Sequence, residues 1–438
     1  MDKILPMKKL AFSFFLIASV IQLVFAQREL IHAKPATLGL DEDFINHKVD
    51  SIMKMGIDSL AFPGAQILVA KNDTVIFHKA YGFHTYDKIQ PVALSDLYDL
   101  ASVTKIAGPL PAIMKLVDEG KLDLDKPFST YWKPWRNRRD KKDLTLREIL
   151  THQAGLVPYI VFLNEVVREN GKVKKRFVHD SPNKRFQGQV YDGLYISNRF
   201  ERKMNRIMNR SKVSDEKKYL YSGLTFLIFP SLIEQLSETD YQTYLEENFY
   251  KPMGAHTLGY LPKGKNYENN IVPTEVDSLF RKTLVNGWVH DENAALKGGV
   301  SGNAGLFATA DDLAKLMLFY QNYGNVDDQQ LISAETVKEF TEVQFRENEN
   351  RRGLGFDKPL LNNSELPLAE AYPSPLASPE SFGHSGFTGT FVWADPVKKL
   401  TYIFLSNRVY PSRDHQNLFN LNIRPALQDV FYRAESDK

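Results

Sequence analysis

Residues 64–83 read GAQILVAKNDTVIFHKAYGF, and they decide the fold class. Two apolar, β-branched runs stand on either side of Lys71-Asn72-Asp73, which predicts a β-hairpin. Residues 389–407, GTFVWADPVKKLTYIFLSN, repeat this design, and Asp395-Pro396 opens the turn. Apolar residues at helical spacing predict amphipathic helices next to the two hairpins, over about 41–60 and 416–432.

Two hairpins near opposite ends of the chain, each flanked by a helix, indicate one antiparallel sheet built from both termini. The segment between them, from about 100 to 380, is typical of a mainly helical and looped insertion. We therefore expect an α+β fold, because the strands and helices do not alternate as they do in a parallel α/β sheet.

Composition narrows the class of function. The 438 residues carry a net charge of +2, and no basic stripe runs through the whole chain, so we expect no nucleic-acid partner. The chain has no cysteine. Disulfides, thiolate nucleophiles, cysteine metal sites and a lipid-modified cysteine are therefore excluded.

The N-terminal residues differ in character from the rest. Lys8 and Lys9 precede the apolar run LAFSFFLIASVIQLVFA at 10–26, a pattern that predicts a signal peptide over 1–26. An uncleaved anchor is the alternative, and 17 apolar residues are barely long enough for one. We expect a leader or linker at 27–40, a single domain at 41–433, and export to the periplasm or exterior of a Gram-negative bacterium. No stable membrane anchor is expected after cleavage, and the oligomeric state stays open.

One stretch is strongly basic. Residues 161–218 contain 15 Lys and Arg against 7 Asp and Glu. They are interpreted either as a solvated helical insertion or as a surface that attracts an anionic polymer or the cell envelope.

The pattern Ser-x-x-Lys occurs four times, beginning at Ser51, Ser102, Ser181 and Ser214. A serine needs a base to become a nucleophile, and a lysine one helical turn away lies on the same helix face. Ser102 alone has apolar neighbours on both sides, in LASVTKIAG at 100–108, whereas the other copies lie in amphipathic or charged surroundings. The candidate pair is therefore Ser102 and Lys105.

Two motifs later in the chain contain further candidate active-site residues. Tyr221-Ser222 lies in KYLYSGLTF, and His384-Ser385-Gly386 lies in FGHSGFTGT directly before the C-terminal hairpin. Each motif is weak alone, but their order and setting are informative. Together with FPGAQILVAKNDTVIFHKAYG, LTLREILTHQAGL and GGVSGNAGLFATADDLAKL, the chain resembles the serine β-lactamase and penicillin-binding-protein superfamily over about 41–433, and within it the class C β-lactamase and DD-peptidase-like branch. VHDENA and LSNRVYP resemble the envelope serine hydrolases of Bacteroidetes-type bacteria.

The resemblance implies a β-lactamase/transpeptidase-like fold and a role for each residue. Ser102 would attack a carbonyl and form an acyl-enzyme. Lys105 or Tyr221 would be the main base, and the choice between them stays open. His384, where many relatives carry lysine, and Ser385 with Gly386 would face the substrate. The N–H groups of Ser102 and Phe387 would form the oxyanion hole. No metal and no cofactor is expected.

The sequence departs from the family pattern at two places. Gly223 stands where many relatives have Asn or Asp, which weakens the case for efficient β-lactam hydrolysis. Pro109 and Pro111 should kink the helix that follows Ser102.

Three functions remain open for a small acyl or peptide substrate, peptidoglycan-derived in the first case. The first is a serine hydrolase of cell-wall peptide or amide bonds, such as a D-Ala-D-Ala carboxypeptidase. The second is an esterase or β-lactamase with the same acyl-enzyme chemistry. The third is a catalytically weak penicillin-binding or sensor protein.

Overall fold

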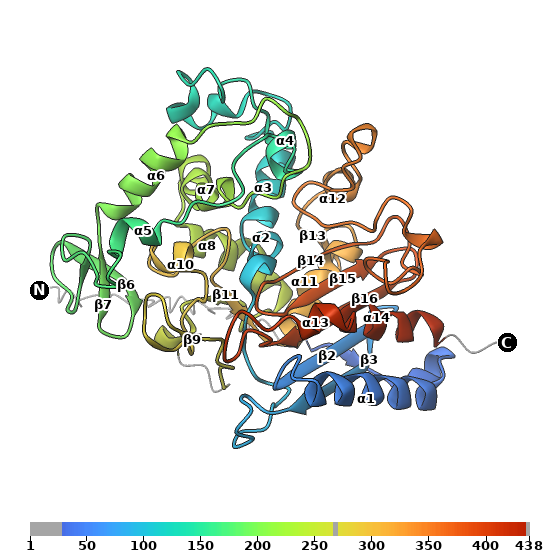
Figure 1. Cartoon of the computed structure of the whole chain (residues 1–438). Helices are drawn as coiled ribbons and strands as arrows, with labels where there is room; N and C mark the ends of the chain where they lie inside the picture. The colour runs from blue at the N-terminus through green and yellow to red at the C-terminus, as the bar shows by residue number, and fades with distance from the viewer. Residues whose placement is uncertain (1–28, 266–269, 435–438) are drawn as a thin grey trace, which may run out of the picture.

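The computed structural model describes residues 29–265 and 270–434 (Figure 1). The expected signal peptide at 1–26 lies outside these residues. Within them, no helix is both long enough and apolar enough to cross a membrane.

Both ends of the chain meet in one six-stranded sheet, as the hairpins predict. Its order is β1-β3-β2-β16-β15-β14. The strands are β1 (Ile31–His32), β2 (Gly64–Lys71), β3 (Thr74–Gly82), β14 (Phe382–Ser385), β15 (Phe391–Asp395) and β16 (Leu400–Ser406). The two hairpins join through antiparallel pairing of β2 with β16, in a register that runs from Ala65 opposite Ser406 to Lys71 opposite Leu400.

The turn of the first hairpin has the expected chemistry. Asn72 and Asp73 have φ values of 50° and 60°. Positive φ at both central residues is the geometry that matches the right-handed twist of hairpin strands, and Asn and Asp tolerate it.

Alternating side chains of the sheet enter two cores. Ile67 and Val69 of β2 pack with α1 (Glu42–Asp58) and α14 (Ile423–Arg433), whereas Leu68 and Ala70 face the larger core on the other side. The helix expected over 416–432 is divided into α13 (Asn417–Asn420) and α14, because Asn422 adopts a left-handed φ of 49°.

The segment expected as a leader or linker at 27–40 contains regular structure. From residue 29 on it belongs to the folded domain, because β1 pairs in parallel with β3 (Ile31 opposite Thr74). Asp41 then caps α1, since its side chain accepts a hydrogen bond from the Phe44 N–H. A two-residue edge strand is too short to leave a recognisable alternation in the sequence.

The middle of the chain is helical and looped, as expected, and it also contains small sheets. Its helices are α2 (Thr104–Ala107), α3 (Pro109–Asp118), α4 (Leu146–Leu150), α5 (Leu163–Val166), α6 (Phe200–Arg210), α7 (Phe229–Ser237), α8 (Tyr241–Leu245), α9 (Lys251–Met253), α10 (Glu292–Ala295), α11 (Ala310–Gln321) and α12 (Ala334–Thr341). Its short strands are β4 (Tyr98–Asp99), β5 (Val178–His179), β6 (Phe186–Tyr191), β7 (Leu194–Ser197), β8 (Gly259–Tyr260), β9 (Val276–Asp277), β10 (Thr283–Leu284), β11 (Leu306–Ala308), β12 (Asn325–Val326) and β13 (Gln329–Gln330).

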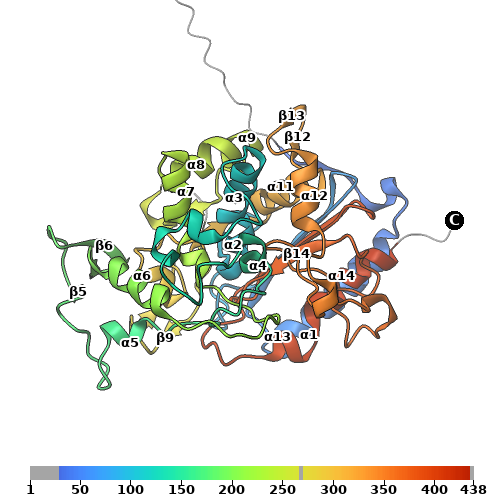
Figure 2. The ribbon, with the colours of Figure 1, turned by 90° about the horizontal axis from the view of Figure 1, so that it is seen from above.

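The basic segment 161–218 is not the purely helical insertion of one interpretation. It places a three-stranded sheet, in the order β5-β7-β6, between α5 and α6. In both views this green segment lies on the side of the molecule away from α1 and α14 (Figures 1 and 2).

Candidate active site

Ser102 stands at a strained entry into a helix. The chain leaves β4, passes through a 3₁₀ turn at Ala101–Val103 and enters α2. Ala101 has a φ of 44°, which is costly for a residue with a Cβ. Asp99 holds this geometry, because its Oδ1 accepts a hydrogen bond from the Ala101 N–H at 2.8 Å. Strain directly before the candidate nucleophile is typical of a functional site.

Lys105 lies one turn after Ser102 and is 2% exposed. Its Nζ donates to Ser102 Oγ at 2.9 Å and to the backbone carbonyl of Asn303 at 2.9 Å. Gly302, the residue before Asn303, packs tightly against the backbone of Phe226, because a Cβ there would lie 2.2 Å from the Phe226 carbonyl oxygen. The lysine amine is thus buried, hydrogen-bonded and directed at the serine.

The other Ser-x-x-Lys copies lack this setting. Lys54 forms an ion pair with Asp58 and its side chain is 77% exposed. Ser181 and Ser214 are also exposed. Among these four copies, a buried lysine hydrogen-bonded to the serine of its own motif is found at Ser102 and Lys105.

The helix after Ser102 is interrupted, as the two prolines predict. Gly108, with φ −107° and ψ −89°, separates α2 from α3, which begins at Pro109. The Ile106 and Ala107 carbonyls accept hydrogen bonds from the hydroxyls of Tyr320 and Tyr250, at 2.6 and 2.9 Å. These side chains satisfy carbonyls at the break.

Tyr221 lies beside Lys105, with Nζ 5.4 Å from the ring centroid. The His152 ring centroid is 4.5 Å from that of Tyr221, and the Arg352 guanidinium carbon is 5.7 Å from it. The Tyr221 hydroxyl is buried and makes no hydrogen bond to a described residue. The tyrosine is therefore near the lysine, but it is not hydrogen-bonded to Lys105 or to Ser102.

Three more buried polar atoms around Tyr221 also lack partners among the described residues: His152 Nε2, Arg352 Nε and His384 Nε2. The other nitrogen of each imidazole is engaged. His152 Nδ1 accepts from the Ser222 N–H at 3.2 Å, and His384 Nδ1 donates to the Ser385 carbonyl at 2.8 Å. This leaves Nε2 of His152 as a donor and Nε2 of His384 as an acceptor.

His384 is buried at 3% exposure, and its ring centroid lies 6.2 Å from that of Tyr221. Burial, together with the charges of Arg352 and Lys105, lowers the pKa of His384 to about 3. Burial and the same two charges lower the pKa of His152 well below its usual value. Both imidazoles are therefore neutral near pH 7, and the Lys105 amine and the Arg352 guanidinium lie beside the Tyr221 ring.

Sequence reasoning missed Arg352 and His152. Arg352 is 2% exposed and forms an ion pair with Asp357, with Nη1 and Oδ1 3.1 Å apart. It lies 131 positions after Tyr221 in a segment without a motif. His152 is in the quoted stretch LTLREILTHQAGL, but a lone histidine there gave no sign of contact with Tyr221.

Phe387 stands next to Ser102 on the wall of one cavity. Its carbonyl accepts from Arg408 Nε at 2.9 Å, and the Arg408 guanidinium carbon lies 4.6 Å from its ring centroid. His290 stacks on the same ring at 5.7 Å. Gly386, just before it, donates its N–H to the Thr390 carbonyl at 2.8 Å. The residue whose N–H is expected in the oxyanion hole is thus held from several directions.

Asp99 connects the two expected oxyanion segments. Its Oδ2 accepts from the His290 N–H at 2.6 Å, and its carbonyl accepts from Thr388 Oγ1 at 2.8 Å. Burial raises the pKa of Asp99, although hydrogen bonds from the His290 and Ala101 amides oppose this. The Asp99 carboxyl therefore links the turn before Ser102 to His290, and its backbone carbonyl links the same turn to Thr388 after Phe387.

Gly223 leaves open space beside the lysine. A Cβ at this position would lie 3.9 Å from Lys105 Cε and 4.0 Å from Asn303 Cβ, which are ordinary contacts. A side chain here would reach Lys105, so the departure from the family pattern removes a neighbour of the candidate base.

The cavity at Ser102, named here the inner cavity, has a volume of about 480 Å³. Half-exposed apolar side chains form its mouth, namely Tyr159, Val161, Leu279 and Phe387. Asp291, Glu292 and Arg413 supply its charges. A cavity of this size, with apolar walls and a few polar groups around a nucleophile, suits a small acyl group.

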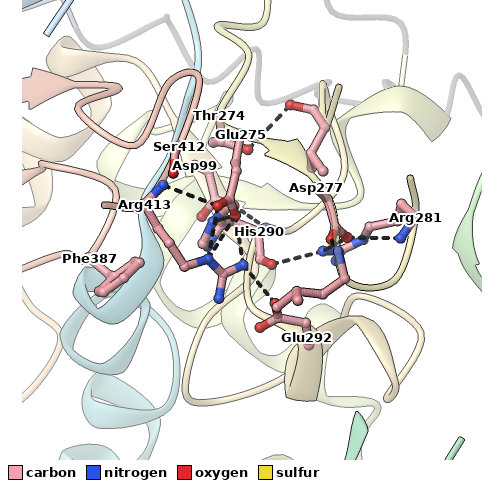
Figure 3. A network of polar contacts seen from close by, with 12 residues as sticks. Asp99, Thr274, Glu275, Asp277, Arg281, His290, Glu292, Phe387, Ser412 and Arg413 are labelled. Carbon is pink, nitrogen blue, oxygen red and sulfur yellow. Dashed lines mark hydrogen bonds and ion pairs between the residues drawn. The ribbon is translucent and has the colours of Figure 1, made fainter. Parts of the chain in front are cut away.

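A charged network fixes one wall of this cavity (Figure 3). Arg413 Nη2 donates to Glu275 at 2.6 Å and to Glu292 at 2.7 Å, and His290 Nε2 donates to Glu275 at 2.7 Å. Burial alone would raise the pKa of Glu275, but hydrogen bonds from His290 and Arg413 lower it to about 2. The Arg413 charge is therefore matched by carboxylates before any substrate enters.

Among residues 29–265 and 270–434, no group of three or more His, Asp or Glu side chains is placed so that it could hold a metal ion.

Comparisons with known proteins agree with this geometry. A family model described as Beta-lactamase matches residues 49–423. A relative from Escherichia coli (strain K12), named "Putative D-alanyl-D-alanine carboxypeptidase", is 28% identical over 419 residues, which cover 90% of this chain and 89% of the relative. A relative of the same name from Escherichia coli O157:H7 is also 28% identical, with the same coverage.

Two solved structures illustrate the similarity in fold. One is EstCE1, described as a hydrolase with promiscuous acyltransferase activity, with a TM-score of 0.62, 17% identity, and coverage of 88% of this chain and 98% of that one. Another is a penicillin-binding protein homologue from Caulobacter crescentus, with a TM-score of 0.61, 18% identity, and coverage of 90% and 99%. The expected β-lactamase/transpeptidase-like fold is confirmed.

Proposed function

Because the chain belongs to the β-lactamase family and is a serine hydrolase, we propose that it works through an acyl-enzyme on Ser102 and cleaves peptide or amide bonds of cell-envelope substrates, as a DD-carboxypeptidase does. The observation that carries this proposal is the 2.9 Å hydrogen bond between Lys105 Nζ and Ser102 Oγ at the edge of the inner cavity. The name shared by the two Escherichia coli relatives supports the substrate class.

The reaction proceeds in two halves. Ser102 Oγ attacks the carbonyl carbon, and its proton passes to Lys105 or Tyr221. A role as base requires Lys105 to be neutral or Tyr221 to be a phenolate. The tetrahedral oxyanion accepts hydrogen bonds from the N–H groups of Ser102 and Phe387. The bond to the leaving amine then breaks, the amine takes the proton, and the acyl group remains on Ser102.

Water completes the cycle. The base removes a proton from water as the water attacks the acyl carbon, and Ser102 Oγ leaves and regains a proton. The free acid and the original enzyme result. His384, Ser385 and Gly386 are proposed to line the path of the substrate along β14.

Export belongs to the same proposal. The basic start and apolar run of residues 1–26 support secretion to the periplasm, where peptidoglycan-derived peptides are found. An enzyme that cleaves such peptides needs access to that compartment.

Specific observations favour an esterase as the second candidate. Gly223 provides no side chain to hydrogen-bond a substrate amide, and the neutral His384 supplies no charge to a substrate carboxylate. Esters have better leaving groups than amides and depend less on these contacts. The similarity in fold to EstCE1 is consistent with this candidate.

One set of assays tests the proposal. The purified protein is incubated with a peptide ending in D-Ala-D-Ala, with a fluorescent penicillin and with p-nitrophenyl acetate, next to Ser102→Ala. Release of D-alanine that is lost in Ser102→Ala supports the carboxypeptidase. Ester turnover without D-alanine release or penicillin labelling supports the esterase. Rapid turnover of penicillin supports a β-lactamase. A stable penicillin adduct without turnover of any substrate supports the binding or sensor protein.

A further inference from the structure

A second cavity adjoins the one that contains Ser102. This outer cavity has a volume of about 960 Å³ and shares Leu163 and Leu279 with the inner cavity. It lies between the end of α5 and the turn that precedes β10, so the basic segment 161–218 forms one of its sides. A substrate longer than its reacting group would pass from one cavity to the other over these two leucines.

The two cavities carry charges of opposite sign. The inner cavity has Asp291 and Glu292, and its Arg413 is already held by carboxylates. The outer cavity is lined by Arg168, Lys174 and Lys282 against one carboxylate, Glu169.

Two of these cations are hydrogen-bonded to backbone carbonyls. Lys174 Nζ donates to the Asn164 carbonyl at 2.9 Å, and Lys282 Nζ donates to the Ser278 carbonyl. Neither carbonyl neutralises an ammonium. The nearby Glu165 lies within the electrostatic reach of Lys174, but it is ion-paired with Lys203.

The residues that surround the outer cavity in the sequence add to its positive electrostatic potential. Residues 168–176, RENGKVKKR, contain five Lys and Arg and a single Glu. Like charges around one concave surface repel one another and raise the local concentration of anions. An anionic ligand relieves this repulsion, and the apolar side chains of Leu163, Val167 and Leu279 offer it a surface for aliphatic groups.

We infer that the outer cavity is a subsite for a carboxylate-bearing peptide extension of the substrate, whose reacting carbonyl lies at Ser102. This rests on the proposed function, and it adds that the preferred substrate is an acidic peptide that spans both cavities. A small neutral ester occupies the inner cavity alone and is indifferent to the outer one.

The test compares two p-nitrophenyl esters whose acyl groups carry the same short peptide, ending in two glutamates or in two glutamines. The variant is Arg168→Gln/Lys174→Gln/Lys282→Gln. The matched control is Lys184→Gln/Arg185→Gln/Lys212→Gln, which removes three exposed cations of the same basic segment that line neither cavity. For the wild type and both variants, the rate of p-nitrophenyl acetate hydrolysis shows whether the fold and the reaction at Ser102 are intact.

The wild type should favour the glutamate ester in kcat/KM by roughly tenfold at low salt, since three partly exposed charge pairs each contribute a few-fold. Half-molar salt should remove most of this preference. In the triple variant of the outer cavity, the ratio of kcat/KM for the glutamate ester to that for the glutamine ester should fall to about one, with p-nitrophenyl acetate turnover unchanged. The control variant should keep the wild-type ratio. No preference in the wild type, an unchanged ratio in the cavity variant, or an equal loss in the control would overturn the inference.

Competition identifies the anion. Triglutamate should inhibit hydrolysis of the glutamate ester in the wild type and not in the cavity variant. Stronger inhibition by pyrophosphate than by triglutamate would overturn the assignment to a carboxylate peptide. The ester ratio does not depend on D-alanine release, so failure of the carboxypeptidase proposal and failure of the subsite remain distinguishable.

Discussion

The two candidate bases lie beside each other but have different surroundings. On what we name the lysine side, the Lys105 amine is held by two hydrogen bonds, to the serine and to the Asn303 carbonyl. On the tyrosine side, the Tyr221 hydroxyl has no hydrogen bond to a described residue, and the side chains of His152, His384 and Arg352, which lie near its ring, also have unpartnered atoms.

The two candidate bases are thus positioned for proton transfer in different ways. The lysine side is arranged by geometry, because fixed hydrogen bonds aim the amine before substrate binds. The tyrosine side is arranged by its neighbours, because an amine, a guanidinium and two neutral imidazoles lie near a phenol whose hydroxyl has no hydrogen bond to a described residue. We expect Lys105 to matter most for forming the acyl-enzyme, and Tyr221 to matter in the proton transfer that follows.

The largest effect is expected for Lys105→Ala. Removing the amine deletes the only side-chain nitrogen hydrogen-bonded to Ser102 in the described residues, and kcat/KM for ester hydrolysis should fall by about 10³-fold. Stopped-flow measurement of acylation checks this. A variant that acylates at the wild-type rate would remove Lys105 from the mechanism.

A smaller loss, of about 10²-fold, is expected for Tyr221→Phe. The ring keeps its packing against His152, so the fold should be unaffected, and only the hydroxyl is lost. Deacylation should slow more than acylation, and the acyl-enzyme should accumulate. If acylation slowed more than deacylation, the division of labour between the two sides would be wrong.

Filling the space at Gly223 should have a moderate effect in the opposite direction. Gly223→Asn places an amide beside Lys105 without a clash, so hydrolysis of penicillin should rise by about tenfold. Gly223→Ala is the control, because it adds the Cβ without the amide. Equal rates in the two variants would show that the missing amide does not limit β-lactam turnover.

The smallest effect concerns the charge on the tyrosine side. His384 has a pKa of about 3, lowered first by burial and then by Arg352 and Lys105. Arg352→Gln removes one of these charges, so the His384 pKa should rise, as NMR titration of the ring would measure. An unchanged pKa would mean that burial alone sets it.

The same shift predicts how stability depends on pH. Between pH 6.5 and 3 the unfolded chain binds a proton at His384 and the folded chain does not, so stability falls as pH falls through this window. His384→Asn should reduce that slope in urea titrations at a series of pH values. Protonation of Glu275 also lowers the stability of the folded protein on acidification, and this contribution is the same in the variant and in the wild type.

Local patterns predicted the frame of the molecule. The hairpin at 64–83 and its counterpart at 389–407 could be identified because their strands are apolar, β-branched runs separated by residues that favour turns, Asn72-Asp73 and Asp395-Pro396. Ser102 could be selected from four copies because buried neighbours surround it in the sequence as well as in space. The break after Lys105 followed from the lack of an N–H in Pro109 and Pro111.

Long-range contacts could not be predicted in the same way. β1 has two residues, too few to show a period, and its parallel partner β3 begins more than 40 positions later. Arg352 reaches Tyr221 from a segment without regular structure, and its importance follows from burial, which one arginine in a polar stretch does not reveal. The hydrogen bond from Arg408 to the Phe387 carbonyl likewise depends on the tertiary fold.

Trapping the acyl-enzyme tests the central claim most directly. The protein is mixed with a fluorophosphonate or a slowly hydrolysed ester and quenched, and the modified residue is mapped by mass spectrometry of the digested protein. The account predicts one adduct per chain, on Ser102, in the wild type and none in Ser102→Ala. An adduct on another residue, or equal labelling of Ser102→Ala, would contradict it.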